Sequence, residues 1–115
     1  MLPREHRLTR SPDFRRAVRR GRRVRADTVV LHALLPSGGE TSAGPVRVGF
    51  VVSKAVGGAT TRNRVKRRLR HIVASRIHRC TPGAIVVVRA LPAAAAAPYA
   101  RLVADVDRGL KVMVR

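Results

Sequence analysis

The clearest pattern of apolar and polar positions runs over residues 60–79. Apolar side chains recur there at spacings of three and four residues, which predicts a helix with one buried stripe. Thr60 or Thr61 is expected to cap this helix. Lys66 and Arg70 flank the stripe, and other basic side chains fall on the opposite side of the helix. The stripe comprises Val65, Leu69, Ile72, Val73 and Ile77, and the opposite side comprises Arg64, Arg67, Arg68 and His71.

The N-terminal part of the chain predicts a short helix after a basic lead-in. Residues 1–10 are basic and aperiodic, and we interpret them as a mobile basic arm or a short extended lead-in. Residues 11–13, Ser-Pro-Asp, have the cap, the proline and the acidic residue that favour a helix start. Gly21 is expected to end the helix. Its apolar face comprises Phe14, Ala17 and Val18.

Three segments are predicted as strands from their length and β-branched content. The first two cover residues 24–35 and 46–53, and we expect them to pair as an antiparallel hairpin. Residues 36–45, rich in Gly and Ser, form the loop between them. Residues 84–90, AIVVVRA, are a continuous apolar run, which is typical of a strand covered on both faces.

The end of the chain completes a single α+β domain over residues 1–115. Residues 91–98, rich in Ala and Pro, are interpreted as a linker to a last helix over residues 99–114. The basic helix then lies between two strands, as a β-α-β unit, so part of the sheet should be parallel. Such crossovers are right-handed in about 98% of proteins, and the residues alone favour that hand.

Charge narrows the class of partner. The chain has 25 Lys and Arg against 6 Asp and Glu, a formal net charge of +19. No acidic residue occurs between residues 41 and 104, so the basic helix has no partners for its own i,i+4 ion pairs. Its cations therefore need an outside polyanion, with nucleic acid considered first and an anionic membrane second. The alternative is a solvated charged face, although an ordinary surface mixes both signs of charge.

Catalytic and metal-binding patterns are missing from the sequence. Asp105 and Asp107 are the only close carboxylate pair, and on a helix they point about 200° apart, so they cannot act on one bond. Cys80 is the single cysteine, which excludes an internal disulfide, and the four His are too scattered for a metal site. There is no signal-peptide pattern and no apolar run of membrane-spanning length. We expect a cytoplasmic protein that binds and does not cut by itself.

Two short motifs carry a family resemblance. Residues 52–57, VSKAVG, lead into residues 62–67, RNRVKR, at the start of the basic helix. This order resembles the protein subunit of bacterial ribonuclease P, whose signature runs from a VSKK-hydrophobic-G turn into an RNR…KR helix. Residues 11–21, 47–50 and 85–88 resemble further segments of that family, so the resemblance covers nearly the whole chain.

The resemblance implies a role in a ribonucleoprotein. In that family the catalytic RNA subunit carries the Mg²⁺-dependent active site and removes the 5′ leader from precursor tRNA. The protein docks on the RNA and grips the leader, so Mg²⁺ is expected mainly on the RNA. No catalytic residue, metal ligand, dinucleotide cofactor or membrane partner is expected for this chain.

The resemblance also implies a fold that departs from the general rule. It implies a two-layer α+β sandwich in which a mixed sheet of about four strands packs with three helices. The order is α-β-β-(β)-α-β-α, and the β-α-β crossover around the basic helix is left-handed.

Site residues are carried over position by position. Phe14 remains open between core packing and a leader cleft, and Asn63 between a helix cap and contact with RNA or metal-bound water. The leader-binding residues are Phe14, Val18 and His32. The RNA-binding residues are Lys54, Arg62, Asn63, Arg64, Lys66, Arg67, Arg68, Arg70 and His71.

The chain departs from the family pattern at five positions. Ala55 replaces a second lysine, Val18 an aromatic residue, and His32 a tyrosine, whose flat ring the imidazole retains. His71 and Gly83 replace residues that are usually acidic or amide, and acidic, respectively. The competing hypothesis is a general basic RNA-binding protein, ribosomal or nucleoid-associated, without a processing role.

Overall fold

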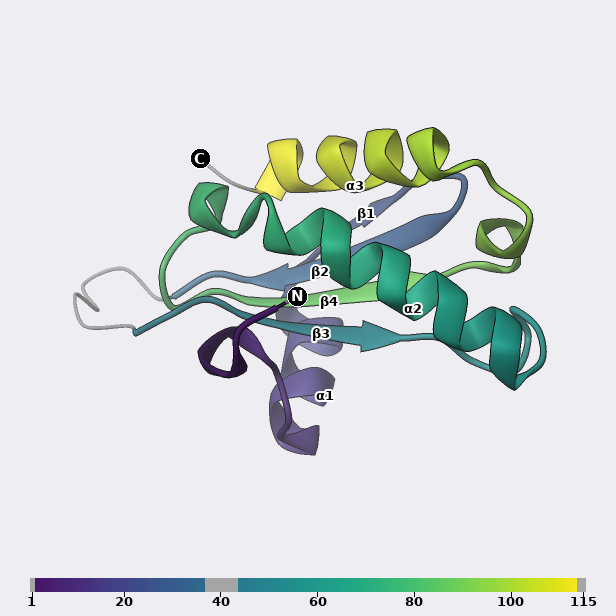
Figure 1. Cartoon of the computed structure of the whole chain (residues 1–115). Helices are drawn as coiled ribbons and strands as arrows, with labels where there is room; N and C mark the ends of the chain where they lie inside the picture. Colours follow the sequence, from purple (N-terminus) through teal and green to yellow (C-terminus); the bar gives the residue numbers. More distant parts are fainter. Residues whose placement is uncertain (1, 37–43, 114–115) are drawn as a thin grey trace.

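A computed structural model of the chain describes residues 2–36 and 44–113. Helices α2 and α3 cover one face of a four-stranded sheet, and the shorter α1 lies on the other face (Figure 1). The sheet and the α2–α3 layer form the expected two-layer sandwich. The elements are η1 (Arg4–His6), α1 (Ser11–Arg20), β1 (Arg22–Arg25), β2 (Val29–Leu34), β3 (Arg47–Val51), α2 (Ala59–Ala74), η2 (Ile77–Arg79), β4 (Ile85–Ala90), η3 (Pro92–Ala95) and α3 (Tyr99–Met113).

The strand order is β1-β2-β4-β3, with β4 antiparallel to β2 and parallel to β3. The predicted hairpin between residues 24–35 and 46–53 is therefore wrong. Residues 24–35 instead take part in a tight β1–β2 hairpin, and β4 separates β2 from β3. The reason is the apolar run of β4, which is buried along most of its length and needs a strand on each side. Most of the predicted 36–45 loop lies outside the described residues.

The crossover from β3 through α2 to β4 is left-handed. In Figure 1 the chain leaves β3 on the right, returns through α2 in front of the sheet, and enters β4 from the left. With α2 toward the viewer and these strands turned upright, β4 lies to the left of β3. The hand implied by the family resemblance is confirmed, and the general preference for the right hand does not hold here.

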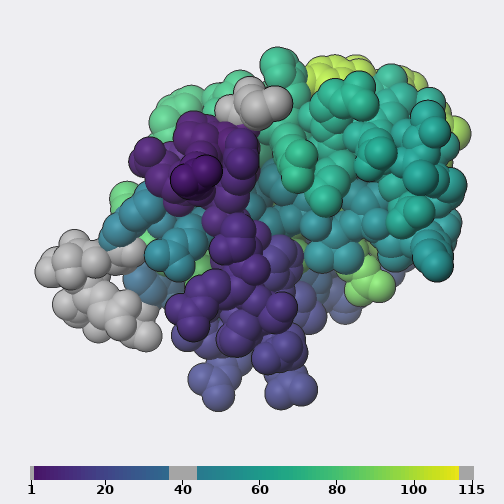
Figure 2. All heavy atoms as spheres, turned by 60° about the horizontal axis from the view of Figure 1, so that its bottom comes forward, coloured from purple at the N-terminus to yellow at the C-terminus, as the bar shows by residue number. Residues whose placement is uncertain are grey.

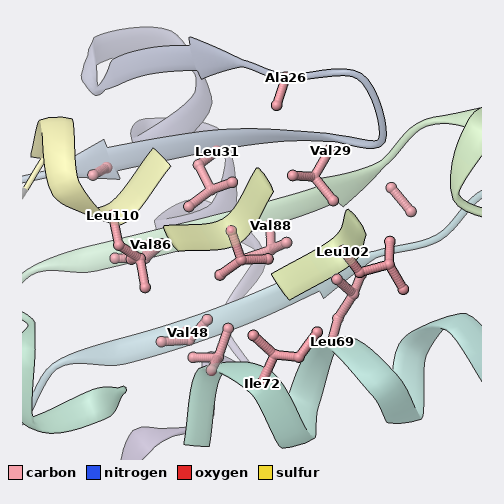
Figure 3. Close-up of a cluster of buried hydrophobic side chains, with 14 of the residues drawn as sticks. Ala26, Val29, Leu31, Val48, Leu69, Ile72, Val86, Val88, Leu102 and Leu110 are labelled. Atoms are coloured by element: carbon pink, nitrogen blue, oxygen red, sulfur yellow. The ribbon is translucent and has the colours of Figure 1, made fainter. Parts of the chain in front are cut away.

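The main core fills the space between the sheet and the α2–α3 layer. Leu69 and Ile72 of α2 and Leu102 of α3 are fully buried against Val48 and Val88 of the sheet (Figure 3). The periodic stripe predicted on α2 is thus the buried face, although the helix ends at Ala74 and a separate turn, η2, follows. A smaller cluster joins α1 to the opposite face of the sheet and comprises Leu8, Ala17, Ile85 and Val87.

Residues 2–10 pack on the domain, which supports the alternative of a short lead-in over that of a mobile arm. Leu2 and Leu8 are buried, and the Leu8 N–H donates to the Val48 carbonyl at 3.0 Å. The His6 ring is 2.7 Å from the Val46 carbonyl. These contacts lay the segment along β3, the edge strand of the sheet, and cover part of its free edge.

The helix ends differ from the predicted caps. Helix α1 begins at Ser11 itself and α2 at Ala59, after Gly58, and neither cap position makes a side-chain hydrogen bond. Gly21 ends α1 in an extended conformation, so its left-handed freedom is not used. A Cβ there would lie 2.4 Å from the Ala17 carbonyl oxygen of α1 and 2.7 Å from the Ala33 carbonyl oxygen of β2, so glycine is needed where the two elements meet.

A buried carboxylate ties the β1–β2 turn to α3. Asp105 accepts hydrogen bonds from the Thr28 N–H at 3.0 Å and from its hydroxyl at 2.6 Å. The Thr28 carbonyl accepts from Leu91 N–H at 2.8 Å, just before η3. The predicted linker at residues 91–98 thus begins with a 3₁₀ turn, and Ala94 within it is fully buried. Thr28 therefore joins the hairpin, the end of β4 and the last helix.

We predict that Asp105→Ala lowers the free energy of unfolding by about 2–3 kcal/mol, because it leaves two buried donors of Thr28 without an acceptor. Urea denaturation followed by circular dichroism measures this at constant ionic strength, which matters for so charged a chain. Asp27→Ala is the matched control: its carboxylate is in the same turn, 81% exposed, and pairs with Arg101. That loss should stay below about 1 kcal/mol. Equal decreases in the free energy of unfolding for both variants would contradict a stabilising role of the Asp105–Thr28 hydrogen bonds.

Candidate nucleic-acid interface

The outer face of α2 presents a cluster of basic side chains. The helix contains no acidic residue, and its buried stripe turns the basic positions toward solvent. Lys54 is also exposed, in the turn before α2, where successive N–H groups donate to the Ser53 and Lys54 carbonyls at 3.1 and 3.2 Å. The exposed side chains of α2 in the predicted set are Asn63, Arg64, Arg67, Arg70 and His71, and the half-buried ones are Arg62, Lys66 and Arg68.

The surroundings of α2 change which side chains are outermost. Arg68, predicted on the outer side, is half-buried, whereas Arg70, predicted as a flanking residue, is exposed. Arg64 is exposed but donates to the Ala95 carbonyl at 3.1 Å, which places η3 on the side of α2 that Arg64 and Arg68 share. The side of α2 that carries Arg70 faces β3, the edge strand of the sheet, and fewer residues cover the side chain there.

Arg62 sits at the margin of this face. Its side chain is half-buried, and its Nε atom is buried without a hydrogen-bond partner among the described residues. Asn63 makes no cap hydrogen bond with its side chain, because Gly58 holds the N-cap position. The local-cap alternative for Asn63 is therefore not supported, and its amide faces solvent beside the guanidinium groups.

The predicted leader-binding residues lie on the opposite face of the sheet. Phe14 is partly buried and packs directly on β3, where a Cβ at Gly49 would come 2.3 Å from the ring. Val18, one turn further along α1, is 47% exposed. His32 on β2 is only 5% exposed, and its Nδ1 has no hydrogen-bond partner within the described chain. Phe14 is thus both a packing residue and a surface residue.

Val18 joins two hollows on this face. One, of about 310 Å³, lies between Phe14, Val18 and Val51. The other, of about 340 Å³, lies between Val18, His32 and Leu91. Phe14 and His32 therefore do not share a pocket, but Val18 connects them into one path across α1 and the sheet.

The chemistry of this path is set by arginines that the sequence analysis did not single out. Arg23 and Arg25 of β1 and Arg89 of β4 line the pocket around His32, and Arg15 and Arg19 line the pocket beside Phe14. Burial lowers the pKa of His32 from its ordinary value of 6.5, and the charges of Arg23 and Arg89 lower it further. The ring is therefore neutral at pH 7. The path combines a neutral ring with cations, which suits an anionic, base-bearing strand.

The two carboxylates of α3 hold parts of the fold together. Asp105 is buried against Thr28, and Asp107 forms an ion pair with Arg76 and lies 3.8 Å from Arg79. The two do not converge on a common site. Among residues 2–36 and 44–113 there is no group of three His, Cys, Asp or Glu side chains that could hold a metal ion. In the same residues, no helix is long and apolar enough to cross a membrane.

Comparison with known proteins identifies relatives along the full length of the chain. A protein-family model described as ribonuclease P matches residues 2–114. The ribonuclease P protein component of Streptomyces bikiniensis is 54% identical over 115 residues, covering 96% of this chain and 94% of the relative. That of Corynebacterium diphtheriae is 47% identical over 117 residues, covering 100% and 98%.

Solved structures show the same fold at lower identity. The RNase P protein of Staphylococcus aureus matches with a TM-score of 0.80 at 21% identity, covering 96% of this chain and 98% of that one. The RNase P protein of Thermotoga maritima matches with a TM-score of 0.76 at 22% identity, covering 95% and 98%. With the family model and the close relatives, these matches show that the chain belongs to the ribonuclease P protein family, as a protein component of the ribonucleoprotein that processes tRNA.

Proposed function

We propose that the chain docks on the catalytic RNA of ribonuclease P through α2 and holds the 5′ leader of precursor tRNA on the opposite face of its sheet. The observation that carries this proposal is that α2 and α1 lie on opposite faces of one sheet (Figure 1), and that basic side chains are exposed or line pockets on both sides. One surface is helical and rich in exposed guanidinium groups. The other is hollowed and offers a phenylalanine, an aliphatic side chain and a neutral imidazole.

The α2 surface suits a structured RNA because its guanidinium groups can bind the phosphates of the RNA backbone. Arg67 and Arg70 are exposed and have no carboxylate on their own helix, so their guanidinium groups are free to bind phosphate oxygens in pairs. His71 and Asn63 add donors beside them. Lys66 and Arg68 are half-buried, and their long stems can lie on the fold while their heads reach outward. Lys54 and Arg62 extend the same surface toward the turn before α2.

The α1 surface suits a single strand because it offers stacking and charge together. Bases of single-stranded RNA stack on flat rings while nearby arginines follow the phosphates. Phe14, Val18 and His32 lie along one path, with arginines on both sides. Val18 replaces an aromatic residue of the family pattern, so we place the stacking contacts at Phe14 and His32 and an apolar contact at Val18.

The chemistry of cleavage is proposed to belong to the RNA. The described carboxylates do not form a cage for Mg²⁺, which prefers several oxygen ligands in octahedral geometry. We therefore propose that Mg²⁺ is held mainly by the catalytic RNA, and that the protein contributes binding and orientation of the substrate. We place this assembly in the cytoplasm.

We predict that RNA-free protein leaves precursor tRNA intact, and that protein with its catalytic RNA and Mg²⁺ cleaves at the mature 5′ end. The reason is the lack of converging carboxylates in the described protein. Gel analysis of end-labelled precursor tRNA checks this, with nuclease-treated protein to remove carried-over RNA. Mg²⁺-dependent cleavage by rigorously RNA-free protein would overturn the proposal.

We predict that Arg67→Ala with Arg70→Ala weakens binding to the catalytic RNA and flattens the plot of log K against log salt by roughly 1 to 2 units. Each lost phosphate contact removes about one unit of slope. Filter binding across a salt series measures this. The control, Arg108→Ala with Lys111→Ala, removes the same charge from exposed positions of α3. Equal changes of slope in both double variants would show general charge attraction in place of a defined α2 surface.

We predict that His32→Ala weakens binding of precursor tRNA with a long leader, by about 1–3 kcal/mol if one base stacks on the ring. The effect should fade as the leader is trimmed to one or two nucleotides. His32→Phe keeps a ring and should restore most of the long-leader affinity. Because His32 is buried, melting curves must show that each variant is folded. A folded His32→Ala protein with unchanged discrimination between leader lengths would remove His32 from the leader path.

A further inference from the structure

A third hollow lies between the N-terminal segment, β3 and α2. It has a volume of about 210 Å³, and Leu8, Phe14, Gly49 and Phe50 form its apolar part. Figure 2 shows the purple N-terminal segment side by side with the teal atoms of the central chain, the two sides between which this hollow lies. Because residues 2–10 pack against β3, the hollow has a wall that the sequence did not predict.

The lining of this hollow combines rings with cations. Only three aromatic side chains occur in the chain, and two of them, Phe14 and Phe50, are here; the third, Tyr99, is on α3. Arg7, Lys66 and Arg70 line the same hollow from two different segments, and its described lining includes no Asp or Glu. Aromatic faces together with unpaired cations are what an unstacked nucleotide requires, since its base stacks and its phosphate is anionic.

The open edge of β3 adds polar groups for the edge of a base. The Leu8 N–H bonds to the Val48 carbonyl, so the backbone groups of Val48 point to the free edge of the sheet. Backbone groups of alternate residues point the same way in a strand, which places the N–H and C=O of Phe50 on that edge too. The isolated bridge from the N-terminal segment reaches Val48 only. A base in the hollow would therefore meet both a donor and an acceptor.

The size of the hollow limits its occupant. Pockets for drug-sized molecules measure about 300–1,000 Å³, so this one suits a single nucleotide and not a dinucleotide or a larger cofactor. Lys66 and Arg70 belong to α2, the element proposed to dock on the catalytic RNA. The occupant is therefore expected from that RNA, although a leader nucleotide would have the same chemistry.

We propose that this hollow binds one unstacked nucleotide of the catalytic RNA. Its base would lie at the edge of β3, where Phe14 approaches from the α1 face and Phe50 from the α2 face, and its phosphate would lie on Arg7, Lys66 and Arg70. The proposal rests on the proposed RNA-docking role of α2 and makes it specific: the protein holds a single extruded base in addition to phosphates. Arg7 is well placed for this because its Nε donates to the Leu2 carbonyl at 3.0 Å, which fixes the guanidinium at the rim.

The test is chemical probing of the full-length RNA subunit, alone and with saturating full-chain protein. We expect one unpaired nucleotide that wild-type protein protects. Its protection should fall roughly five-fold or more with Lys66→Ala and with Phe50→Leu, the lower end of the effect of one stacked base. Arg4→Ala is the matched control, since Arg4 is exposed on the same N-terminal segment and does not line the hollow. It should leave the protection unchanged.

Further variants and outcomes distinguish failure of this inference from failure of the proposed function on which it rests. Arg67→Ala should weaken binding overall without selectively exposing that nucleotide once the protein is saturating. Phe50 is partly buried, so its variant is checked by thermal melting, and Lys66→Ala provides the same readout without touching the core. Normal RNA binding and cleavage, with no unpaired nucleotide protected by the protein, would contradict nucleotide binding in the hollow and leave the proposed function intact. Protection found only on a long leader of added precursor tRNA would overturn the assignment to the catalytic RNA.

Discussion

The distribution of charge is the constraint on which the rest of the structure depends. A chain with 25 Lys and Arg and only 6 Asp and Glu cannot neutralise its own surface. The described carboxylates are concentrated at joints of the fold: Asp105 at Thr28, Asp107 at Arg76, and Asp13 near Arg16 and Arg47. None lies on α2. Arg64 donates to a backbone carbonyl, but no cation of α2 is paired with a carboxylate within residues 2–36 and 44–113. Nucleic acid supplies phosphates at the density that such a row of cations requires.

The central position of β4 turns this charge into two separate surfaces. Because β4 pairs on both sides, its neighbours β2 and β3 each expose one face to α1 and the other to the helical layer. The basic helix α2 is then fixed on one side of the sheet and α1 on the other (Figure 1). His32 belongs to the α1 side, because it lines a pocket together with Val18. The left-handed crossover sets which edge α2 overhangs, and this edge is β3, where the N-terminal segment also packs.

Local patterns were enough to predict some of this arrangement. The stripe of α2 and the apolar run of β4 were both recovered, because burial of a regular element leaves a periodic or continuous apolar trace. The β1–β2 turn was missed because its anchor, Asp105, lies 77 residues from Thr28 in the sequence. The packing of residues 2–10 was missed because two leucines are too few to form a period.

In the candidate site too, some features follow from the local sequence and others depend on the tertiary fold. The basic helix could be identified from its residues, but the exchange of exposure between Arg68 and Arg70 depends on where η3 lies. Arg23, Arg25 and Arg89 gave no usable signal, since arginine is common along the entire chain and only the fold gathers these three around His32. The charge of such a sequence predicts the class of partner, but the fold determines which arginines lie together at the candidate site.

The contact between Phe14 and Gly49 links the two surfaces that we propose for RNA binding. The ring lies so close to the β3 backbone that any side chain at position 49 would displace it, and with it the part of α1 that carries Val18. The same ring borders both the proposed leader path and the hollow at the edge of β3. A nucleotide held on one side of Phe14 therefore limits the positions that the ring can adopt toward the other side. If the two proposed sites are correct, docking of the catalytic RNA would order the proposed leader path through this shared side chain without any movement of the sheet, because ordering one contact lowers the entropic cost of the next.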